Sequence, residues 1–512
     1  MNHRNHVQIA LVELPELKLL DPNGNNLLPP RKREPLISKQ VLMAGLQAEG
    51  FTVHLVNMQD SEYEEEFDQI AWRGIPLRKL YTGWNLARID PADFDIWGLT
   101  VNFTLHREIA CMVIQRLAAG GKPVIVGGSD AVAEPAIYFQ AGASAIVKDK
   151  SGAANAAIFD YFIQQRATQE RPTGVLFPDG KINTSYHQLM SPDDWPLPSL
   201  ETARLCMGDE SWMKPYPEAY LPVGSVFPDI GCDRKCTFCQ TPTYRLGYQS
   251  MTPERTLEWV KVQKDAGAGS VMFVSDQFLG RTLWPDGRDE ILEIMRGVRA
   301  LEMPIIWPNG LELRKTTLGR GFNRTGSDLS PDEELIDALW GWDGVKGAYG
   351  AYIPAERPIE GTGAYAKLLP WREHVTLLKR IVQSGIPIIS YGVIIGFPTD
   401  THESLLRLEE ALMEVYAEVK SVNPNLQFML TPFVISPIPS TPQAAEIRES
   451  GLLVFDDPII YSGFWTASVN TNHLSYAELS DWQYRLTSIG DQEKYTGVSV
   501  DTIQHYAKQR LS

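Results

Sequence analysis

The sequence predicts an α/β protein with a doubly wound parallel sheet in its N-terminal part, a partial (β/α)6 barrel in its middle and a mainly helical C-terminal extension. Apolar strands alternate with amphipathic helices between residues 7 and 147, and a strand-then-helix unit repeats between residues 223 and 433. Such alternation is typical of parallel sheets whose faces are covered by helices. With 512 residues, the chain is too long for one ordinary domain. We expect a first domain over 1–163, a linker over 164–221, the barrel over 222–445 and the extension over 446–512.

Composition and charge narrow the class of protein. The sequence is 44% hydrophobic and 10% aromatic, enough for sizeable cores, and its formal net charge is −16 with a pI near 5.1. An acidic chain is a poor partner for nucleic acid or an anionic membrane surface. No apolar run approaches the roughly 20 residues that cross a bilayer, and the N-terminus lacks the apolar core of a signal peptide. Five cysteines without a disulfide framework are typical of a reducing compartment. We therefore expect a cytoplasmic protein without a membrane span.

The N-terminal domain has a flavodoxin-like pattern. We expect its strands at 7–14, 52–56, 94–101 and 123–126, its helices at 37–49 and 108–119, and a last helix–strand pair over 134–147. Ligands of such sheets bind beyond the carboxyl ends of the strands, where the strand order switches. Gly127 and Gly128 directly follow one strand, and two missing side chains let the backbone approach a ligand closely. This edge is therefore the candidate binding site of the domain.

The linker is rich in Pro, Asp and Ser and has weak periodicity, which indicates an extended connector. We interpret its tryptophans Trp195 and Trp212 as docking anchors without a chemical role.

The barrel pattern begins at Val223. Its predicted strands lie at 223–230, 270–275, 305–307, 346–352, 387–395 and 426–433, each followed by a helical pattern or the end of the barrel. Right-handed crossovers would roll these units into an incomplete barrel. Since barrel enzymes work at the carboxyl ends of their strands, the loops that follow the strands are the candidate catalytic segments.

The loop after the first barrel strand carries the strongest chemical signal. Cys232, Cys236 and Cys239 form a Cys-x3-Cys-x2-Cys motif, which can hold three irons of a 4Fe–4S cluster and leave the fourth iron open. A closed zinc site needs a fourth ligand, and no histidine lies between His187 and His374. Zinc with a distant ligand, or reduced thiols, remain alternatives. The other two cysteines, Cys111 and Cys206, are unrelated to the motif.

With Phe238 directly before the third cysteine, this motif resembles the signature of the radical S-adenosylmethionine (SAM) enzymes. In that family the open iron is chelated by SAM, whose reductive cleavage produces a 5′-deoxyadenosyl radical. The resemblance implies that the three cysteines are the metal ligands and catalytic residues. It also implies an electron donor such as flavodoxin or ferredoxin.

Further motifs match the family at the later strand ends. Ser275-Asp276-Gln277 stands where the family has its amine-binding Gly-Gly-Glu motif, and Gly392 to Gly396 matches a segment that packs on adenine. The implied SAM-binding residues are Phe238, Ser275, Asp276, Gln277, Ile394 and Gly396. Two positions depart from the pattern: Asp400 replaces a glutamate, and Glu356 is displaced from the usual ribose-binding position.

A flavodoxin-like domain directly before this motif resembles the cobalamin-binding domain of the cobalamin-dependent branch. The cobalamin-binding residues that this implies are Thr100, Asn102, Phe103, Gly127, Gly128 and Ser129. Because no Asp-x-His-x-x-Gly motif is present, cobalt would have no histidine ligand. Its lower face would meet residues 102–104 or, alternatively, 81–84. Lys148 to Gly152 replaces an acidic turn of the relatives, and a domain that serves only as scaffold is the alternative.

The resemblance implies a 4Fe–4S cluster, SAM and cobalamin as cofactors, and methyl transfer to an unactivated carbon as the reaction. The expected substrate is a small molecule or a peptide of a biosynthetic pathway, and nucleic acid is not expected. An oxidative cyclase or rearrangement enzyme of the same branch is the first alternative, and a non-enzymatic cobalamin- or metal-binding regulator is the second. The C-terminal extension either closes the barrel mouth or caps its base. Its pocket candidates are Tyr461, Trp465, Asn470 and His473.

Overall fold

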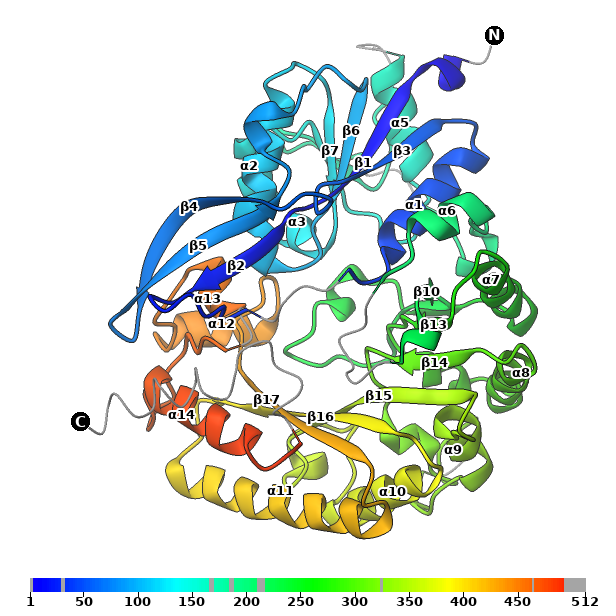
Figure 1. Cartoon of the computed structure of the whole chain (residues 1–512), viewed down its shortest axis with the longest axis vertical. Coiled ribbons are helices and arrows are strands. Elements are labelled where there is room, and N and C mark those ends of the chain that lie inside the picture. The colour runs from blue at the N-terminus through cyan, green and yellow to red at the C-terminus, as the bar shows by residue number, and fades with distance from the viewer. Residues whose placement is uncertain are drawn as a thin grey trace.

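The computed structural model describes residues 3–28, 33–164, 170–183, 188–209, 217–322, 326–462 and 465–491. Figure 1 shows the N-terminal domain above the barrel, with the C-terminal extension, orange to red, beside both. None of the described helices combines the length and the apolar character that a membrane crossing requires.

The N-terminal sheet has the flavodoxin-like strand order that the sequence predicts. Its strands run in the order β3 (Thr52–Asn57), β1 (Gln8–Glu13), β6 (Ile96–Thr100), β7 (Val124–Gly127), β8 (Ala145–Val147) and β9 (Val175–Leu176). All neighbours are parallel except β8 and β9. The strand order reverses between β1 and β6, which is the switch point where such sheets bind ligands.

Helices cover both faces of this sheet. They are α1 (Ile37–Ala48), α2 (Arg107–Ala118), α3 (Ser129–Ala133), α4 (Pro135–Ala141) and α5 (Asn155–Ile163). On one face, Leu46 of α1 and Phe159 of α5 pack with Leu11. On the other face, Val113 of α2 packs with Val12. Because alternate side chains of a strand point to opposite faces, the continuously apolar β1 contributes to both cores.

A second sheet in this domain was not predicted from the sequence. It is antiparallel, in the order β2 (Glu16–Leu20), β5 (Ile75–Gly83) and β4 (Tyr63–Trp72). Most residues of β4 are exposed or half-buried and several are acidic, so the strand lacks the apolar alternation by which strands are recognised. Residues 81–83, one predicted candidate for the lower face of cobalamin, lie in β5 and not in a loop.

The middle of the chain forms the predicted six-stranded parallel sheet. Its order is β10 (Val223–Val226), β13 (Ser270–Phe273), β14 (Pro304–Trp307), β15 (Gly347–Glu356), β16 (Ile388–Ile395) and β17 (Gln427–Val434). Within the described strands, β10 and β17 do not pair, so the barrel is incomplete, as expected. The predicted first strand is split at Pro228: its second half is β11 (Asp229–Gly231), which pairs antiparallel with β12 (Tyr248–Ser250).

Helices on the outside of the barrel connect its strands. They are α7 (Pro253–Asp265), α8 (Gly287–Ala300), α9 (Glu333–Trp340), α10 (Trp371–Gln383) and α11 (His402–Val422). The largest apolar core of the molecule lies between these helices and the strands.

The predicted linker contains α6 (Leu200–Leu205) as well as β9. Trp195 is buried, donates its indole N–H to the Ser151 carbonyl oxygen at 2.8 Å and stacks on Phe227 at 5.6 Å. It therefore docks the connector between the two sheets, as predicted. Trp212 lies outside the described residues.

The C-terminal extension joins the two domains. It contains α13 (Pro458–Tyr461) and α14 (Tyr476–Thr487), and α12 (Pro442–Glu449) crosses its predicted start at residue 446. Gln483 of α14 donates to the Pro432 carbonyl oxygen in β17 at 2.8 Å. On the other side, Trp72 of β4 donates to the Ala467 carbonyl oxygen at 2.9 Å. The extension thus packs on the barrel edge and on the antiparallel sheet of the N-terminal domain (Figure 1).

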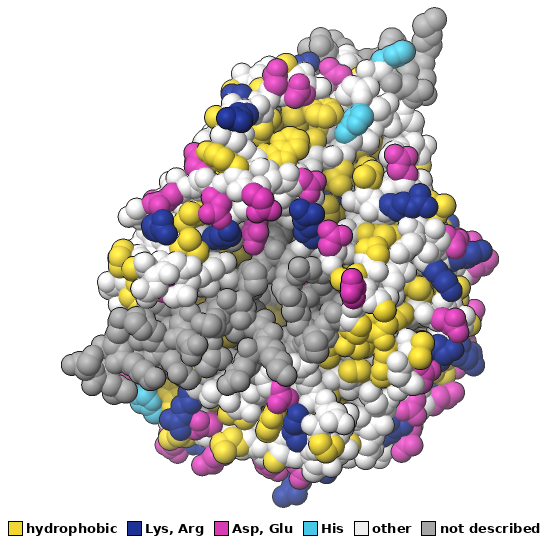
Figure 2. All heavy atoms as spheres, in the orientation of Figure 1, with side chains coloured by type: hydrophobic (Ala, Val, Ile, Leu, Met, Phe, Trp, Pro, Cys, Tyr) yellow, Lys and Arg dark blue, Asp and Glu magenta, His cyan; other side chains and the backbone are white. Residues whose placement is uncertain are grey.

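The surface agrees with the acidic composition. On the described part of the face in Figure 2, lysine and arginine side chains are scattered among acidic ones and do not merge into one basic area.

Candidate functional site

The three motif cysteines lie on one loop at the carboxyl edge of the barrel. The loop leaves β11 and returns through β12, so that Gly231 lies opposite Tyr248. Gly231 has φ of 78°, and a Cβ there would lie 1.8 Å from the Gly247 carbonyl oxygen. Only glycine fits at this position. Cys232, Cys236 and Cys239 are half-buried free thiols, and the hairpin fixes both ends of the loop that carries them.

The spread of the three sulfurs fits a multi-iron cluster better than a single ion. Among the described residues, only Asp68, Glu108 and Asp457 bring three possible ligand atoms within 4.8 Å of one another. The three cysteine sulfurs do not meet this limit, so at least two of them lie more than 4.8 Å apart. A zinc ion with Zn–S bonds of about 2.3 Å would hold its sulfurs about 4 Å apart. Three thiolates of a 4Fe–4S cluster instead bind three separate irons. The loop therefore offers three thiol ligands whose sulfurs do not all lie within 4.8 Å of one another, which is wider than a single zinc ion would hold them.

The motif after β13 is tied to the start of this loop. Ser275 Oγ donates to the buried carboxylate of Asp229, at 2.6 and 2.8 Å from its two oxygens. Asp276 Oδ2 accepts the N–H of Gly231 at 2.7 Å. Burial raises the pKa of Asp229 to about 6 and also raises the pKa of Asp276. Asp276 Oδ1 has no hydrogen-bond partner among the described residues, and this side chain keeps exposed surface. Of the predicted SAM-binding residues here, Asp276 has an oxygen available for a ligand.

A charged network holds the cysteine loop on the barrel. Arg234 in the loop donates through both Nε and Nη2 to the buried carboxylate of Glu312, which follows β14. Gln277 Nε2 donates to the same carboxylate at 3.3 Å, and Lys315 pairs with Asp233 of the loop. Bidentate arginine–carboxylate pairs fix geometry as well as charge. The network thus orients the loop before any cofactor is bound.

The fourth barrel strand also reaches the cysteine loop. Glu356 ends β15 with φ of 56°, a left-handed conformation, and its carboxylate accepts from Lys367 at 2.5 Å. The Lys367 ammonium lies 5.4 Å from the centre of the Phe238 ring, which makes an edge contact with Tyr365 at 5.2 Å. Glu356 Oε2 and Tyr365 Oη are buried, and within the described residues neither makes a hydrogen bond of good geometry, although Thr237 lies near the Tyr365 hydroxyl. Glu356 Oε2 is therefore a buried acceptor beside the loop that a ligand hydroxyl group could satisfy.

The structure explains the presence of Asp400 in the turn after β16. Asp400 Oδ2 accepts the N–H groups of Gly396 and Phe397 at 2.8 and 3.0 Å, and Arg357 donates to both of its oxygens. Asp400 is buried and fully engaged, so it shapes the turn and does not face a ligand. Ile394 and Gly396, predicted to pack on adenine, lie at the end of β16 at the same barrel edge.

The predicted cobalamin-binding residues converge on two neighbouring loops of the N-terminal sheet. Thr100 ends β6 and Gly127 ends β7, and the two residues are paired. Asn102 and Phe103 are exposed, and Phe103 has 67% of its surface accessible. Gly128 has φ of 100°, and a Cβ there would lie 2.3 Å from the Val101 carbonyl oxygen. The Asn102 amide oxygen accepts the N–H of Ser129 at 3.4 Å. Glycine at 128 thus lets the two loops touch.

A buried aspartate that the sequence reasoning missed holds these two loops together. Asp130 Oδ1 accepts from Thr104 Oγ1 at 2.6 Å and from Arg107 Nη2 at 2.8 Å, while Oδ2 accepts from Arg107 Nε at 2.9 Å and from Tyr138 Oη at 2.5 Å. Asp130 is 1% exposed. Its position directly after Gly128-Ser129 was the available signal, but its partners come from other elements.

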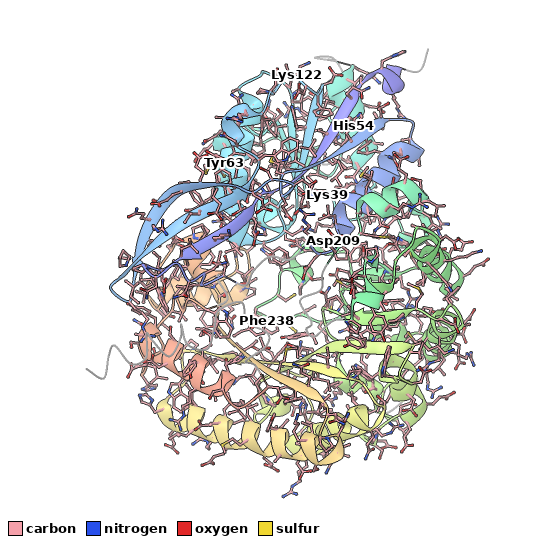
Figure 3. All side chains as sticks on the ribbon, viewed as in Figure 1. Lys39, His54, Tyr63, Lys122, Asp209 and Phe238 are labelled. Carbon is pink, nitrogen blue, oxygen red and sulfur yellow. The ribbon has the colours of Figure 1, made fainter. Side chains whose placement is uncertain are left out.

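The two carboxyl edges face each other across the molecule. Lys150 of the N-terminal domain donates to Ser129 Oγ at 3.1 Å and lies 4.8 Å from the centre of the Tyr244 ring, which follows the cysteine loop. Nearby, Ser440 of the barrel donates to the Ala133 carbonyl oxygen at 3.5 Å. Phe238 accordingly lies in the middle of the molecule, between the two sheets (Figure 3).

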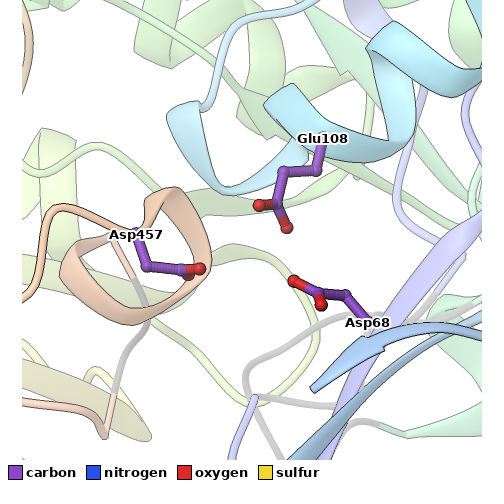
Figure 4. Close-up of side chains that lie close together, drawn as sticks. All are labelled: Asp68, Glu108 and Asp457. Carbon is purple, nitrogen blue, oxygen red and sulfur yellow. The ribbon is translucent and has the colours of Figure 1, made fainter. Parts of the chain in front are cut away.

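The carboxylates of Asp68, Glu108 and Asp457 converge away from these edges (Figure 4). The ammonium of Lys79, which is 0% exposed, pairs with all three. Because the buried ammonium already lies among the three carboxylates, we interpret the group as an ion cluster and not as a metal site. It fastens the C-terminal extension to the N-terminal domain.

The four pocket candidates of the C-terminal extension differ in burial and in their contacts. Tyr461 is 1% exposed and Trp465 belongs to the core of the N-terminal domain. The Asn470 amide oxygen accepts the N–H of Tyr476 at 2.8 Å, and His473 is exposed. Trp465 thus packs in the core of the N-terminal domain, which its sequence position did not reveal.

Solved structures with the same fold are cobalamin-dependent radical SAM enzymes. The enzyme OxsB, solved with aqua-cobalamin and SAM bound, aligns with 93% of this chain at a TM-score of 0.63 and 14% identity, and the alignment covers 66% of OxsB. The methyltransferase TsrM from Kitasatospora setae, solved with tryptophan and a SAM analogue, aligns with 94% of this chain and 88% of its own at a TM-score of 0.55 and 15% identity. Another TsrM structure contains cobalamin and a 4Fe–4S cluster. The chain therefore has the fold of these enzymes, as the resemblance in sequence predicted. The cofactors bound in those structures, cobalamin, SAM and a 4Fe–4S cluster, are the three that the sequence predicted.

Curated relatives match a smaller part of the chain. The tRNA-2-methylthio-N(6)-dimethylallyladenosine synthases of Bacillus thuringiensis and Bacillus mycoides are 27% and 28% identical over 226 and 220 residues. The matched stretch covers 43% of this chain and 38% of the B. thuringiensis relative, so the chain spans about two fifths of its length. No protein-family model matches the chain.

Proposed function

We propose that this protein is a cobalamin-dependent radical SAM enzyme, with methyl transfer to an unactivated carbon of a small molecule or peptide as its reaction. One observation carries the proposal. The cysteine loop of the barrel and the glycine loop of the N-terminal sheet face each other, with Lys150 in contact with both sides. Two cofactors bound at these two edges would meet at one reaction site.

The chain's own residues divide the work in this proposal. Cys232, Cys236 and Cys239 would hold the cluster, and Asp276 Oδ1 would accept from the methionyl ammonium of SAM. The loops around Asn102 and Gly128 would hold cobalamin. When bound, the cluster and SAM supply a 5′-deoxyadenosyl radical and cobalamin supplies the methyl group. The surrounding protein excludes water and orients the reacting groups.

Methyl transfer is preferred because TsrM, a methyltransferase, aligns along nearly its whole length with this chain. Action on tRNA, which the name of the curated relatives implies for them, is disfavoured by the net charge of −16. We further propose a reduced flavodoxin or ferredoxin as electron donor and, because the thiols must stay reduced, the cytoplasm as compartment.

Anaerobic reconstitution of the full chain with iron, sulfide and hydroxocobalamin tests the proposal. We expect about four irons per chain, a cobalamin absorption band at stoichiometric occupancy after desalting, and release of 5′-deoxyadenosine when SAM and a reductant are added. Iron without cobalamin would overturn the methyl-transfer mechanism, and the absence of both chromophores would overturn the whole proposal.

A further inference from the structure

Lys150 is half-buried, and its neighbours differ from those of the buried lysines Lys39, Lys79 and Lys315 and of the half-buried Lys367. Lys39, Lys79 and Lys315 each pair with at least one carboxylate, and so does Lys367. Lys150 has no carboxylate within 4 Å among the described residues, and its neighbours are the Ser129 hydroxyl and the face of Tyr244. A half-buried ammonium beside the cysteine loop that has no carboxylate within 4 Å is a candidate binding group for an anion.

The segment that carries Lys150 is held rigidly. Asp149 accepts the N–H of Ser151 and the N–H of Ala154, both at 2.8 Å. Trp195 donates to the carbonyl oxygen of Ser151 from the other side. A side chain on a fixed backbone loses less freedom when it binds a ligand. Lys150 is thus presented to the domain junction by its neighbours in sequence.

Lys150 and the Asp276 carboxylate lie beside the same loop, because Asp276 accepts from Gly231 at its start and Lys150 lies over the ring of Tyr244 after its last cysteine. The charge of Lys150 favours the ionised form of Asp276, although burial raises the pKa of that carboxyl overall. Burial likewise lowers the pKa of Lys150 to about 8, and Asp276 counteracts this. The two groups are more than 4 Å apart, since they form no ion pair among the described residues. An ammonium and a carboxylate that interact without direct contact leave room for a ligand that carries one negative and one positive group.

We propose that Asp276 and Lys150 together bind an α-amino-acid group, with its ammonium on Asp276 and its carboxylate on Lys150. This subsite is shared between the domains, because Asp276 follows a barrel strand whereas Lys150 belongs to the N-terminal domain. The inference rests on the proposed function, since SAM carries such a group. The same chemistry is present in an amino-acid substrate, and the experiment separates these two sources.

The experiment measures equilibrium binding to the reconstituted full chain, with SAM and decarboxylated SAM as probes. Lys150→Met removes the ammonium, Lys150→Arg keeps a cation, and Lys148→Met changes an exposed lysine two residues away as the matched control. The quantity compared is the affinity for SAM divided by the affinity for decarboxylated SAM. If SAM binds at this subsite, this ratio falls about tenfold in Lys150→Met and is partly kept in Lys150→Arg. In Lys148→Met it stays near the wild-type value. The ratio isolates the contribution of the SAM carboxylate to binding, because the two probes differ only in that group and other effects of a substitution act on both.

A second arm tests the other source. Wild-type protein saturated with SAM is dialysed against the twenty amino acids, and retention of an amino acid that Lys150→Met loses would assign the subsite to the substrate. If the affinity ratio is unchanged and no amino acid is retained, the proposal is overturned. Should Lys150→Met fail to fold, as judged by circular dichroism, Lys150→Gln, which also removes the ammonium, replaces it in the same comparison.

Iron and cobalamin are determined for every sample. Wild-type protein without either would refute the proposed function, whereas loaded protein with an unchanged affinity ratio would refute the shared subsite alone.

Discussion

The two carboxyl edges that face each other are built in different ways. At the barrel edge, three cysteines sit on a loop held by ion pairs from Arg234 to Glu312 and from Lys315 to Asp233. At the edge of the N-terminal sheet, Asp130 gathers hydrogen bonds from Thr104, Arg107 and Tyr138 beneath two loops that expose backbone and Phe103.

This difference follows from what each edge offers a ligand. The barrel edge offers side-chain ligands, so its loop must hold sulfur atoms at fixed positions. The N-terminal edge offers mainly backbone and shape, so its polar side chains are turned inward to support the loops. Substitutions at the two edges should therefore have different effects. At the barrel edge a substitution removes a ligand of the cluster, and at the N-terminal edge it removes a side chain that supports the loops.

Cys236→Ala should have the largest effect. Loss of one of three protein ligands should reduce iron in the reconstituted protein from about four per chain to a small fraction. Release of 5′-deoxyadenosine should fall at least about a hundredfold, which corresponds to a rise of about 2.7 kcal/mol or more in the activation barrier. Cobalamin retention should be unchanged, because the N-terminal edge is intact. Iron analysis, the cobalamin spectrum and product assay measure all three.

Cys111→Ala is the control for this variant, because Cys111 is a half-buried thiol of α2 outside the loop. It should keep both iron and cobalamin. Equal iron loss in the two variants, or loss of cobalamin in Cys236→Ala, would contradict the separation of the edges.

Asp130→Asn should have the opposite pattern. The amide leaves the buried Arg107 guanidinium without its counter-ion, and breaking a buried pair of this kind costs about 3–5 kcal/mol. We expect a lower free energy of unfolding in urea and loss of cobalamin after desalting, while iron content stays near the wild-type value. Asp93→Asn, an exposed aspartate of the same domain, is the matched control. Retained cobalamin in a destabilised Asp130→Asn would show that the loops keep their shape without this support.

The barrel edge was largely predictable from the sequence, because local signals carry it. The Cys-x3-Cys-x2-Cys spacing is contained in one loop, and the nearly continuous apolar run of β16 indicates a strand covered on both faces. Parallel topology then brings the loops after successive strands to one edge. This is why Asp276 and Gly231, 45 residues apart, could be expected near each other.

The supporting residues were not predictable, because their partners are distant and ordinary in type. In the sequence, Asp130 is only a polar residue after a glycine turn. No local pattern predicts its hydrogen bond with Tyr138, because that contact depends on how α3 and α4 pack. Lys79 meets Asp457 across 378 residues. The sheet that carries Lys79 was itself missed, because β4 is acidic and mostly solvent-facing. Burial of a polar group is a property of the packed fold and leaves no periodic mark in the sequence.

The third prediction concerns His374, which lies below the barrel edge and touches neither loop. His374 Nε2 is 2.7 Å from Tyr391 Oη, and burial lowers the pKa of its imidazole to about 4. In the unfolded chain a histidine has a pKa near 6.5. The unfolded state therefore binds a proton first, so stability is retained above pH 6.5 and falls as the pH drops from 6.5 toward 4. The loss should reach about 2 kcal/mol at pH 5.

His374→Gln removes this titration and should flatten the dependence of the unfolding free energy on pH. At pH 7.5 the variant should be less stable than wild type, because the contact with Tyr391 is weakened, and the difference should shrink by about 2 kcal/mol at pH 5. Urea unfolding at the two pH values measures it, with His54→Gln, an exposed histidine, as the control. Parallel curves for wild type and His374→Gln would mean that His374 becomes protonated in the folded state. Because this residue lies outside both edges, iron and cobalamin contents should stay unchanged at neutral pH, which separates the stability of the barrel body from the chemistry of the loops above it.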